Sequence, residues 1–258
     1  MKNVLLASFA AFALASGSAL AADMGMPLKA PPPPPPAASW TGCFVGAGGG
    51  YGFYDLSSTL VSTATGIPAN VTLDQGGRGW LGMGSVGCDY QFSLGGLGNW
   101  VIGAFGDGEW ADIHGLHTGL NPSVGLINGD MKMSSQWDVG GRVGYLVTPA
   151  LLTYWDAGYT EAHFGGTNYF FFGAAVPSGF VASANYNGYF IGGGTEYAFT
   201  WLPIRGLFWK NEYRFAEYDS KTLPTFILPS GAPTGQSEAN HPYVQTITTE
   251  LVYRFNWW

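Results

Sequence analysis

Four histidines are the residues of this chain best suited to catalysis or metal binding. His114 and His117 are three residues apart and follow Asp112, and imidazole and carboxylate groups together can bind a metal ion. A histidine could also act as the base of an acyl-transfer site that contains a serine and an acid, and His163 and His241 are further candidates. The sequence contains no H-x-S or H-E-x-x-H arrangement, and loop histidines are commonly just solvated. We therefore expect no catalytic residue, no metal site and no cofactor.

A second set of ionisable residues occupies alternating positions within apolar segments. Two carboxylates in such a set could act as general acid and base. Arginines and a lysine occur at the same positions, which favours mutual charge balance instead. We expect a network of charges on one face of the segments, formed by Asp89, Asp107, Glu109, Asp138, Arg142, Glu196, Lys210, Glu212, Arg214, Glu250 and Arg254, with Asp156 on the same face.

The segment 243–257 shows what kind of element carries these charges. Two sets of residues alternate strictly: one becomes apolar and aromatic toward its end, from Leu251 to Trp257, and the other includes Glu250 and Arg254. A period of two predicts a β-strand with two different faces, and here the charges are expected to face a polar lumen while the aromatic residues face lipid. The final aromatic residues are expected to serve as an outer-membrane assembly signal formed by Tyr253, Phe255, Trp257 and Trp258.

Eight segments have the character of strands, and their connections alternate between long and short. The strands are predicted at 40–54, 77–93, 99–112, 134–148, 151–164, 186–200, 206–218 and 243–257. The long connections are predicted at 55–76, 113–133, 165–185 and 219–242. This pattern predicts an all-β fold, an eight-stranded antiparallel up-and-down transmembrane β-barrel with long external loops and short periplasmic turns.

Prolines provide a second test of this strand map. A strand in a closed barrel has no free edge and tolerates a missing N–H poorly. Each proline after residue 40 falls within or at the edge of a predicted connection, as expected: Pro68, Pro122, Pro149, Pro177, Pro203, Pro224, Pro229, Pro233 and Pro242.

The two cysteines fall on the first two predicted strands, and both point outward by parity. If the connection between these strands is centred near residue 65, Cys43 lies opposite Cys88 and Val45 lies opposite Val86. Directly opposed residues in an antiparallel pair can be close enough for a disulfide, which an oxidising periplasm would preserve. The alternative is a pair of free, lipid-facing thiols.

The start of the chain predicts export. Lys2, an apolar run over 4–14 and the sequence Ala19-Leu20-Ala21 are typical of a signal peptide at 1–21. Residues 22–39 contain an unbroken proline run at 31–36, which favours a stiff periplasmic linker and could alternatively contact the cell wall. The barrel is expected at 40–258.

Composition agrees with a membrane barrel and excludes one class of partner. Only 10% of the residues are charged, 16% are aromatic and 40 are glycine. Without Lys2, 9 Lys and Arg stand against 17 Asp and Glu, a net charge of −8. A nucleic-acid partner is therefore not expected, because no basic run could neutralise phosphates.

Several motifs, in their order and spacing, resemble the small alphaproteobacterial outer-membrane proteins, the RopB-type, OmpA-like eight-stranded barrels often labelled porins. The motifs are Trp40-Thr41-Gly42, Phe44-Val45-Gly46-Ala47, Gly49-Gly50-Tyr51, Gly141-Arg142-Val143-Gly144-Tyr145, the segment 192–199, Asn211-Glu212-Tyr213-Arg214 and the leader Pro27-Leu28-Lys29-Ala30-Pro31. The chain departs from the family pattern at Cys43, Cys88, Phe105 and Trp258. The resemblance implies an abundant outer-membrane barrel and no catalytic residues.

Two functions follow as expectations. The first is a barrel that supports envelope structure and surface contact and forms at most a narrow channel, because eight strands enclose little more than their own side chains. Its expected partners are outer-membrane lipid and lipopolysaccharide, the barrel-assembly machinery, periplasmic chaperones, and the cell wall or other surfaces. The second is a lipid A-modifying enzyme with a histidine-based site at the external rim.

Overall fold

The computed structural model describes residues 38–255, apart from residue 71 and residues 122–124. The predicted signal peptide, residues 22–37 of the predicted linker, and Trp257 and Trp258 lie outside the described residues. No helix in the described part of the chain has the length and hydropathy of a membrane span.

The described part of the chain contains a short 3-10 turn, Gly95–Leu97, and the strands β1 (Gly42–Ser62), β2 (Leu73–Ser93), β3 (Asn99–Asn121), β4 (Gly125–Thr148), β5 (Leu151–Phe164), β6 (Thr167–Phe171), β7 (Gly179–Val181), β8 (Ala184–Ala198), β9 (Leu207–Tyr218), β10 (Lys221–Ile227) and β11 (Pro233–Phe255).

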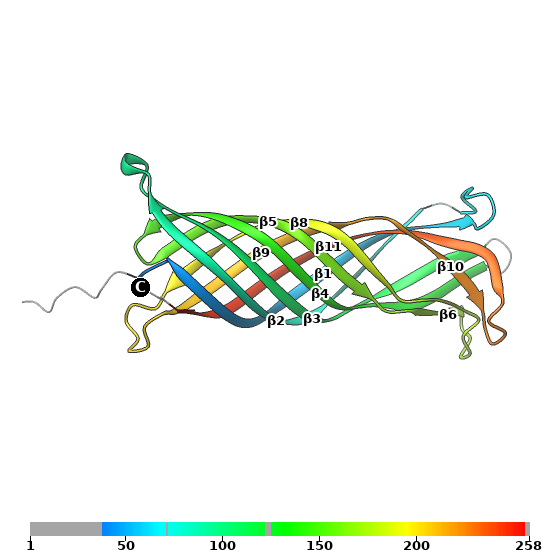
Figure 1. The fold of residues 1–258 in the computed structure, drawn as a ribbon. Coiled ribbons are helices and arrows are strands. Elements are labelled where there is room, and N and C mark those ends of the chain that lie inside the picture. The colour runs from blue at the N-terminus through cyan, green and yellow to red at the C-terminus, as the bar shows by residue number, and fades with distance from the viewer. Residues whose placement is uncertain (1–37, 71, 122–124, 256–258) are drawn as a thin grey trace, which may run out of the picture. The chain divides into compact units, whose positions relative to one another are not determined.

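Eight of these strands form a closed antiparallel barrel (Figure 1). The order around the barrel is β1-β2-β3-β4-β5-β8-β9-β11, and β11 pairs back onto β1. Val45 of β1 lies opposite Val86 of β2 on one side and Tyr253 of β11 on the other. The eight-stranded up-and-down barrel predicted from the alternating sequence is therefore confirmed.

Alternation along the strands separates a charged interior from an apolar exterior. On β9, for example, Lys210, Glu212 and Arg214 are buried, whereas Trp209 and Tyr213 are exposed. Exposed aromatic residues gather toward both ends of the apolar band. One group is Tyr90, Tyr145, Tyr197, Trp209, Tyr253 and Phe255, and the other is Phe53, Trp80, Trp110, Trp137, Tyr159 and Tyr189. Such paired aromatic girdles are typical of barrels whose outer face contacts lipid.

Beyond the second girdle the wall continues as an extension built on β6, β7 and β10. These strands link β4 to β11: Ile127 of β4 lies opposite Phe171 of β6, β7 pairs with both β6 and β10, and β10 pairs with β11. The extension lies at the end of the barrel opposite the start of β1 and the end of β11 (Figure 1).

The four long connections were predicted to be longer than they are, because most of their residues taken together are in strands. β1 continues to Ser62, β3 to Asn121, β4 begins at Gly125 and β11 begins at Pro233. Outside an apolar band both faces of a strand can be polar, so these segments lack the alternation that marks a half-buried strand. Their strand structure comes from pairing with neighbours that are distant in sequence.

Two prolines depart from the expectation that prolines lie in connections. Pro224 lies within β10, next to a shift in its register with β11. Pro242 lies within β11, between the last pair with β9, at Tyr243, and the first pair with β10, at Asn240. Irregular positions such as these tolerate the missing N–H of proline.

Candidate functional site

The interior of the barrel holds the predicted charge network. All of the predicted side chains are buried, with at most 7% of any residue exposed: Asp89, Asp107, Glu109, Asp138, Arg142, Glu196, Lys210, Glu212, Arg214, Glu250 and Arg254. Asp156 is buried among them. Residues on every barrel strand except β1 contribute to this set, so the network spans the lumen.

A balanced cluster lies at the end of the barrel near Trp40. Arg142 donates from Nε to Oδ1 of Asp89 at 2.9 Å, and Arg254 donates from Nη1 to Oδ2 of Asp89 at 2.6 Å. Both guanidinium groups also bond Glu196, at 3.2 Å and 2.7 Å. Two cations thus neutralise two anions, which is the arrangement that makes burial of charge tolerable. The guanidinium of Arg254 also lies 5.1 Å from the centre of the Trp40 ring.

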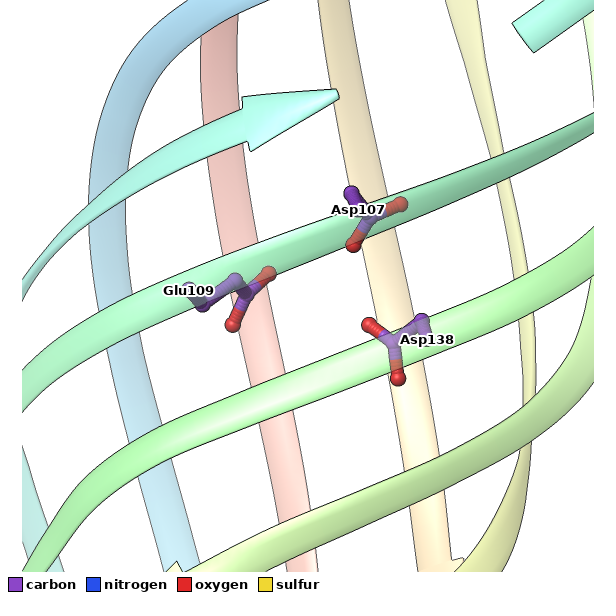
Figure 2. A group of neighbouring side chains, drawn as sticks. All are labelled: Asp107, Glu109 and Asp138. Carbon is purple, nitrogen blue, oxygen red and sulfur yellow. The ribbon is translucent and has the colours of Figure 1, made fainter. Parts of the chain in front are cut away.

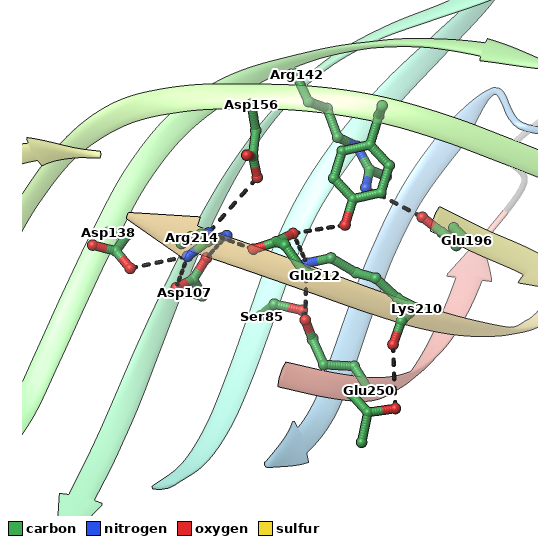
Figure 3. A network of polar contacts seen from close by, with 12 residues as sticks. Ser85, Asp107, Asp138, Arg142, Asp156, Glu196, Lys210, Glu212, Arg214 and Glu250 are labelled. Atoms are coloured by element: carbon green, nitrogen blue, oxygen red, sulfur yellow. Dashed lines mark hydrogen bonds and ion pairs between the residues drawn. The ribbon is translucent and has the colours of Figure 1, made fainter. Parts of the chain in front are cut away.

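The second cluster is centred on Arg214 and Lys210 (Figure 3). Arg214 bonds both carboxylate oxygens of Asp107 at 2.9 Å and one oxygen of Asp138 at 2.9 Å. Lys210 bonds Glu250 at 2.8 Å and Glu212 at 2.9 Å. Bidentate contact to a planar guanidinium fixes the position of the aspartate as well as its charge.

Carboxylates outnumber cations within the lumen. The buried acids are Asp89, Asp107, Glu109, Asp138, Asp156, Glu196, Glu212 and Glu250, against the cations Arg142, Lys210, Arg214 and Arg254. The whole excess lies in the second cluster, because the first is balanced. Neither oxygen of Glu109 has a hydrogen-bond partner among the described residues. Neither oxygen of Asp156 has one either, but Asp156 lies 3.7 Å from Nε of Arg214, whereas no ion pair involves Glu109 among the described residues.

Three of these acids are close enough to be considered as metal ligands. One oxygen from each of Asp107, Glu109 and Asp138 lies within 4.8 Å of the others, and Figure 2 shows the three side chains on neighbouring strands β3 and β4. Arg214 already bonds both aspartates, however. The guanidinium thus supplies positive charge where a cation would otherwise be needed.

The histidines are distributed over different surroundings. His114 and His117 lie on opposite faces of β3, because residues three apart on a strand point to opposite sides. His114 is on the exterior beyond the second girdle, where hydrogen bonds to Asp130 and Asp112, both at 2.9 Å, raise its pKa above the usual range. The alternative that His114 and His117 bind one metal ion is therefore wrong, because their side chains lie on opposite faces of the strand.

The other histidines also have separate partners. His117 is buried, with its Nε2 atom 3.3 Å from Oε2 of Glu238. His163 bonds the side chain of Asn185 at 2.5 Å, and His241 lies 3.6 Å from Glu217. Sequence reasoning missed the contact between His117 and Glu238, because both residues fall in segments predicted as loops.

The cysteines form a cross-strand pair near the same end as the balanced cluster. Cys43 of β1 lies directly opposite Cys88 of β2, and their Cα atoms are 3.9 Å apart. The two sulfur atoms are bonded to each other. Of the two alternatives left open by the sequence, the structure has the disulfide.

An apolar layer separates the charge network from the extension. The rings of Tyr54 and Phe164 are 5.5 Å apart, and the rings of Phe164 and Tyr186 are 5.4 Å apart. Ile113 and Met133 are buried in the same core, and none of these five residues is more than 4% exposed. Charged side chains and this layer together fill the bore of the barrel.

Comparisons with known proteins agree with this architecture. Residues 7–255 match the model of a family described as the outer membrane protein beta-barrel domain. A search of curated proteins found no matching sequence.

Three solved structures are among those found to be similar to this chain. Ail, the attachment invasion locus protein of Yersinia pestis, has 10% identity and a TM-score of 0.32, covering 80% of this chain and 99% of that chain. The outer membrane protease OmpT from Escherichia coli has 11% identity and a TM-score of 0.40, covering 84% and 98%. The outer membrane protein OprG from Pseudomonas aeruginosa has 11% identity and a TM-score of 0.45, covering 85% and 99%.

Proposed function

Because the chain belongs to the outer membrane protein beta-barrel family, we propose that it is an outer-membrane barrel of the RopB type that supports envelope structure and surface contact without forming an open pore. The observation that carries this proposal is the filled lumen. Arg142 and Arg254 bridge Asp89 and Glu196 across the bore, and Arg214 joins Asp107 to Asp138. A path for solutes would have to break these buried ion pairs, and removing one partner of such a pair costs about 3–5 kcal/mol.

The remaining parts of the proposal concern export and contact. Residues 1–21 direct secretion and are removed, and residues 22–39 form a periplasmic tether that can reach the cell wall. The exposed aromatic band contacts lipid and lipopolysaccharide. The end of β11, with Tyr253 and Phe255 on its outer face, is read by periplasmic chaperones and the barrel-assembly machinery.

The proposal contains no catalytic step. Its support is that the four histidines have four separate sets of partners, described above, so they do not form one constellation with a nucleophile. Deacylation of lipid A by the purified barrel, abolished by His163→Ala, would overturn this part and restore the enzyme alternative.

Conductance in a planar bilayer tests the central claim. The refolded full chain, shown to be folded by its heat-dependent gel mobility, is expected to give no stable unitary steps. Arg142→Ala should increase leakage, because it leaves Asp89 and Glu196 each with one fewer partner. Stable steps from the unchanged protein, altered in size by Arg142→Ala or Glu212→Gln, would mean that the lumen is an open path.

A further inference from the structure

Arg78 is an exposed cation just beyond the second girdle. It lies on the outer face of β2, two residues from Trp80 in the direction of the extension. Aromatic girdles lie at the level of the lipid headgroups in membrane barrels, so Arg78 lies in the layer that holds the lipid phosphates. Its side chain forms no hydrogen bond or ion pair with another described residue.

The lysines beyond this girdle in the described residues are, in contrast, already paired. Nζ of Lys132 lies 2.6 Å from Oδ1 of Asp112, and Lys221 donates a hydrogen bond to the backbone oxygen of Asn185. A guanidinium can donate two parallel hydrogen bonds to the oxygens of a phosphate, and this geometry is specific. Arg78 is therefore the cation at this end that is available to an anion from outside the chain.

Arg78 begins a row of three basic side chains on neighbouring strands. His114 of β3 lies directly opposite Arg78, and Lys132 of β4 lies directly opposite His114. All three are on the outer face of the wall. The row runs obliquely away from the apolar band, because His114 is four residues beyond Trp110 whereas Arg78 is two residues beyond Trp80. Arg78 is thus the member of the row nearest to the lipid.

Two aspartates beside the row would repel an anion unless their charges are offset. The two ring nitrogens of His114 lie 2.9 Å from Oδ1 of Asp112 and 2.9 Å from Oδ2 of Asp130. A neutral imidazole carries a hydrogen on only one nitrogen, so both contacts are hydrogen bonds only when His114 is protonated. These bonds, to Asp130 first and to Asp112 second, raise the pKa of His114 above its usual range.

The charge beside Arg78 therefore depends on pH. Asp112 and Asp130 contribute two negative charges and Lys132 contributes one positive charge, so this group has a net charge of −1 while His114 is neutral. Protonation of His114 brings the sum to zero. A phosphate bound to Arg78 would then meet no net negative charge from these neighbours.

Two further acids face outward on the other side of Arg78. Asp55 of β1 lies opposite Gly76, and Asp74 of β2 lies opposite Ser57, whose hydroxyl donates to it at 2.6 Å. Both acids are farther along their strands from the apolar band than Arg78. A phosphate that approaches from the lipid side therefore meets Arg78 first.

From these features we infer that Arg78 binds the phosphate group of an anionic lipid at the second girdle, and that protonation of His114 strengthens this binding. Arg78 donates hydrogen bonds to the phosphate oxygens, while Lys132 and protonated His114 offset the two aspartates beside it. The inference deepens the proposed function and rests on it, because the lipid beside this girdle is then lipopolysaccharide, which carries phosphate groups.

Native mass spectrometry of the full chain, released from detergent, tests the inference with two lipids that have the same acyl chains. Phosphatidylglycerol carries a net negative charge at both about pH 5.5 and about pH 8, and phosphatidylcholine carries no net charge. At the lower pH the protein is expected to bind phosphatidylglycerol about fivefold more tightly, the effect of one basic side chain near anionic lipid. Arg78→Gln should abolish this preference. Arg205→Gln makes the same change at an exposed residue between β8 and β9, at the opposite end of the barrel, and should retain the preference.

A change of pH tests the part assigned to His114. Raising the pH to about 8 should weaken binding of phosphatidylglycerol severalfold and leave binding of phosphatidylcholine unchanged. His114→Gln should bind phosphatidylglycerol weakly at both pH values. His163→Gln alters another outward-facing histidine, on β5, and should keep the pH dependence of the unchanged protein. Heat-dependent gel mobility shows that each variant is folded.

Three results would overturn the inference. They are equal binding of the two lipids by the unchanged protein, a preference for phosphatidylglycerol that survives Arg78→Gln, and a pH dependence that survives His114→Gln. Binding of inorganic phosphate that depends on Arg78, without any preference between the lipids, would assign the site to the free ion instead. Conductance is measured separately, so a silent barrel with equal lipid binding would contradict this inference and leave the closed lumen intact.

Discussion

At the scale of single residues, the lumen contains carboxylates that stabilise the barrel and at least one that opposes it. Asp107 is held by two hydrogen bonds from Arg214, whereas neither oxygen of Glu109 has such a partner. Both acids lie on β3 and are buried, so they differ mainly in their partners. A buried ion contributes to stability only where its partners offset the loss of hydration.

This contrast predicts opposite results for the same change at neighbouring positions. Asp107→Asn should lower the free energy of unfolding by about 1.5–3 kcal/mol, because it replaces the bidentate carboxylate contact to Arg214 with a single neutral acceptor. Glu109→Gln should leave that free energy unchanged or raise it, because it removes an unpartnered charge beside Asp138. Urea unfolding in lipid vesicles, followed by tryptophan fluorescence, measures both. A loss for Glu109→Gln as large as that for Asp107→Asn would contradict the assignment.

The sequence predicts which residues face the lumen but not how they pair. Parity alone identifies Arg214, Asp107 and Glu109 as inward residues, because lipid on the outside excludes charge. The bond between Arg214 and Asp107 joins residues 107 positions apart and crosses the lumen. Pairing depends on which side chains lie close enough to one another within the closed barrel. The sequence therefore could not predict that Glu109 lacks a hydrogen-bond partner.

At the scale of elements, the disulfide ties β1 to β2 near the end that also carries the balanced cluster. Cys43 and Cys88 are separated by 45 residues, and closing a loop of this length restricts the unfolded chain. The chain-entropy estimate for such a loop is about 4 kcal/mol. We expect no free thiols in denatured, unreduced protein and two after reduction.

The double variant Cys43→Ser, Cys88→Ser should therefore unfold at a lower urea concentration than the oxidised protein. Reduced, unmodified protein is the matched control, and it should unfold at nearly the same concentration as the double variant. A count of two free thiols before reduction would show that the bond does not form.

The elements that cross the apolar band could be predicted well, and those of the extension could not. β5, Leu151–Phe164, has the predicted bounds, because lipid on one face and charges on the other impose strict alternation. β6, β7 and β10 are short and lie where neither face must be apolar. Their pairing with β4 and β11 is a property of the assembled barrel, so local sequence pattern does not reveal it.

At the scale of the whole molecule, the barrel has two different ends. One end holds the start of β1, the end of β11, the turn at Gly95–Leu97 and the disulfide. The other holds the extension built on β6, β7 and β10. Short connections are typical of the periplasmic end of such barrels, so the extension should face the outside of the cell.

Cysteine labelling on intact cells tests this orientation. Ser230 lies in the exposed turn between β10 and β11, at the tip of the extension, and Gly96 lies in the exposed turn between β2 and β3 at the opposite end. Ser230→Cys should react with a membrane-impermeant maleimide on whole cells. Gly96→Cys should react only after the outer membrane is disrupted. A Cβ atom at Gly96 meets no other atom within 4 Å, so this control variant should fold normally. The reverse labelling pattern would place the extension in the periplasm and contradict the orientation inferred from the short connections.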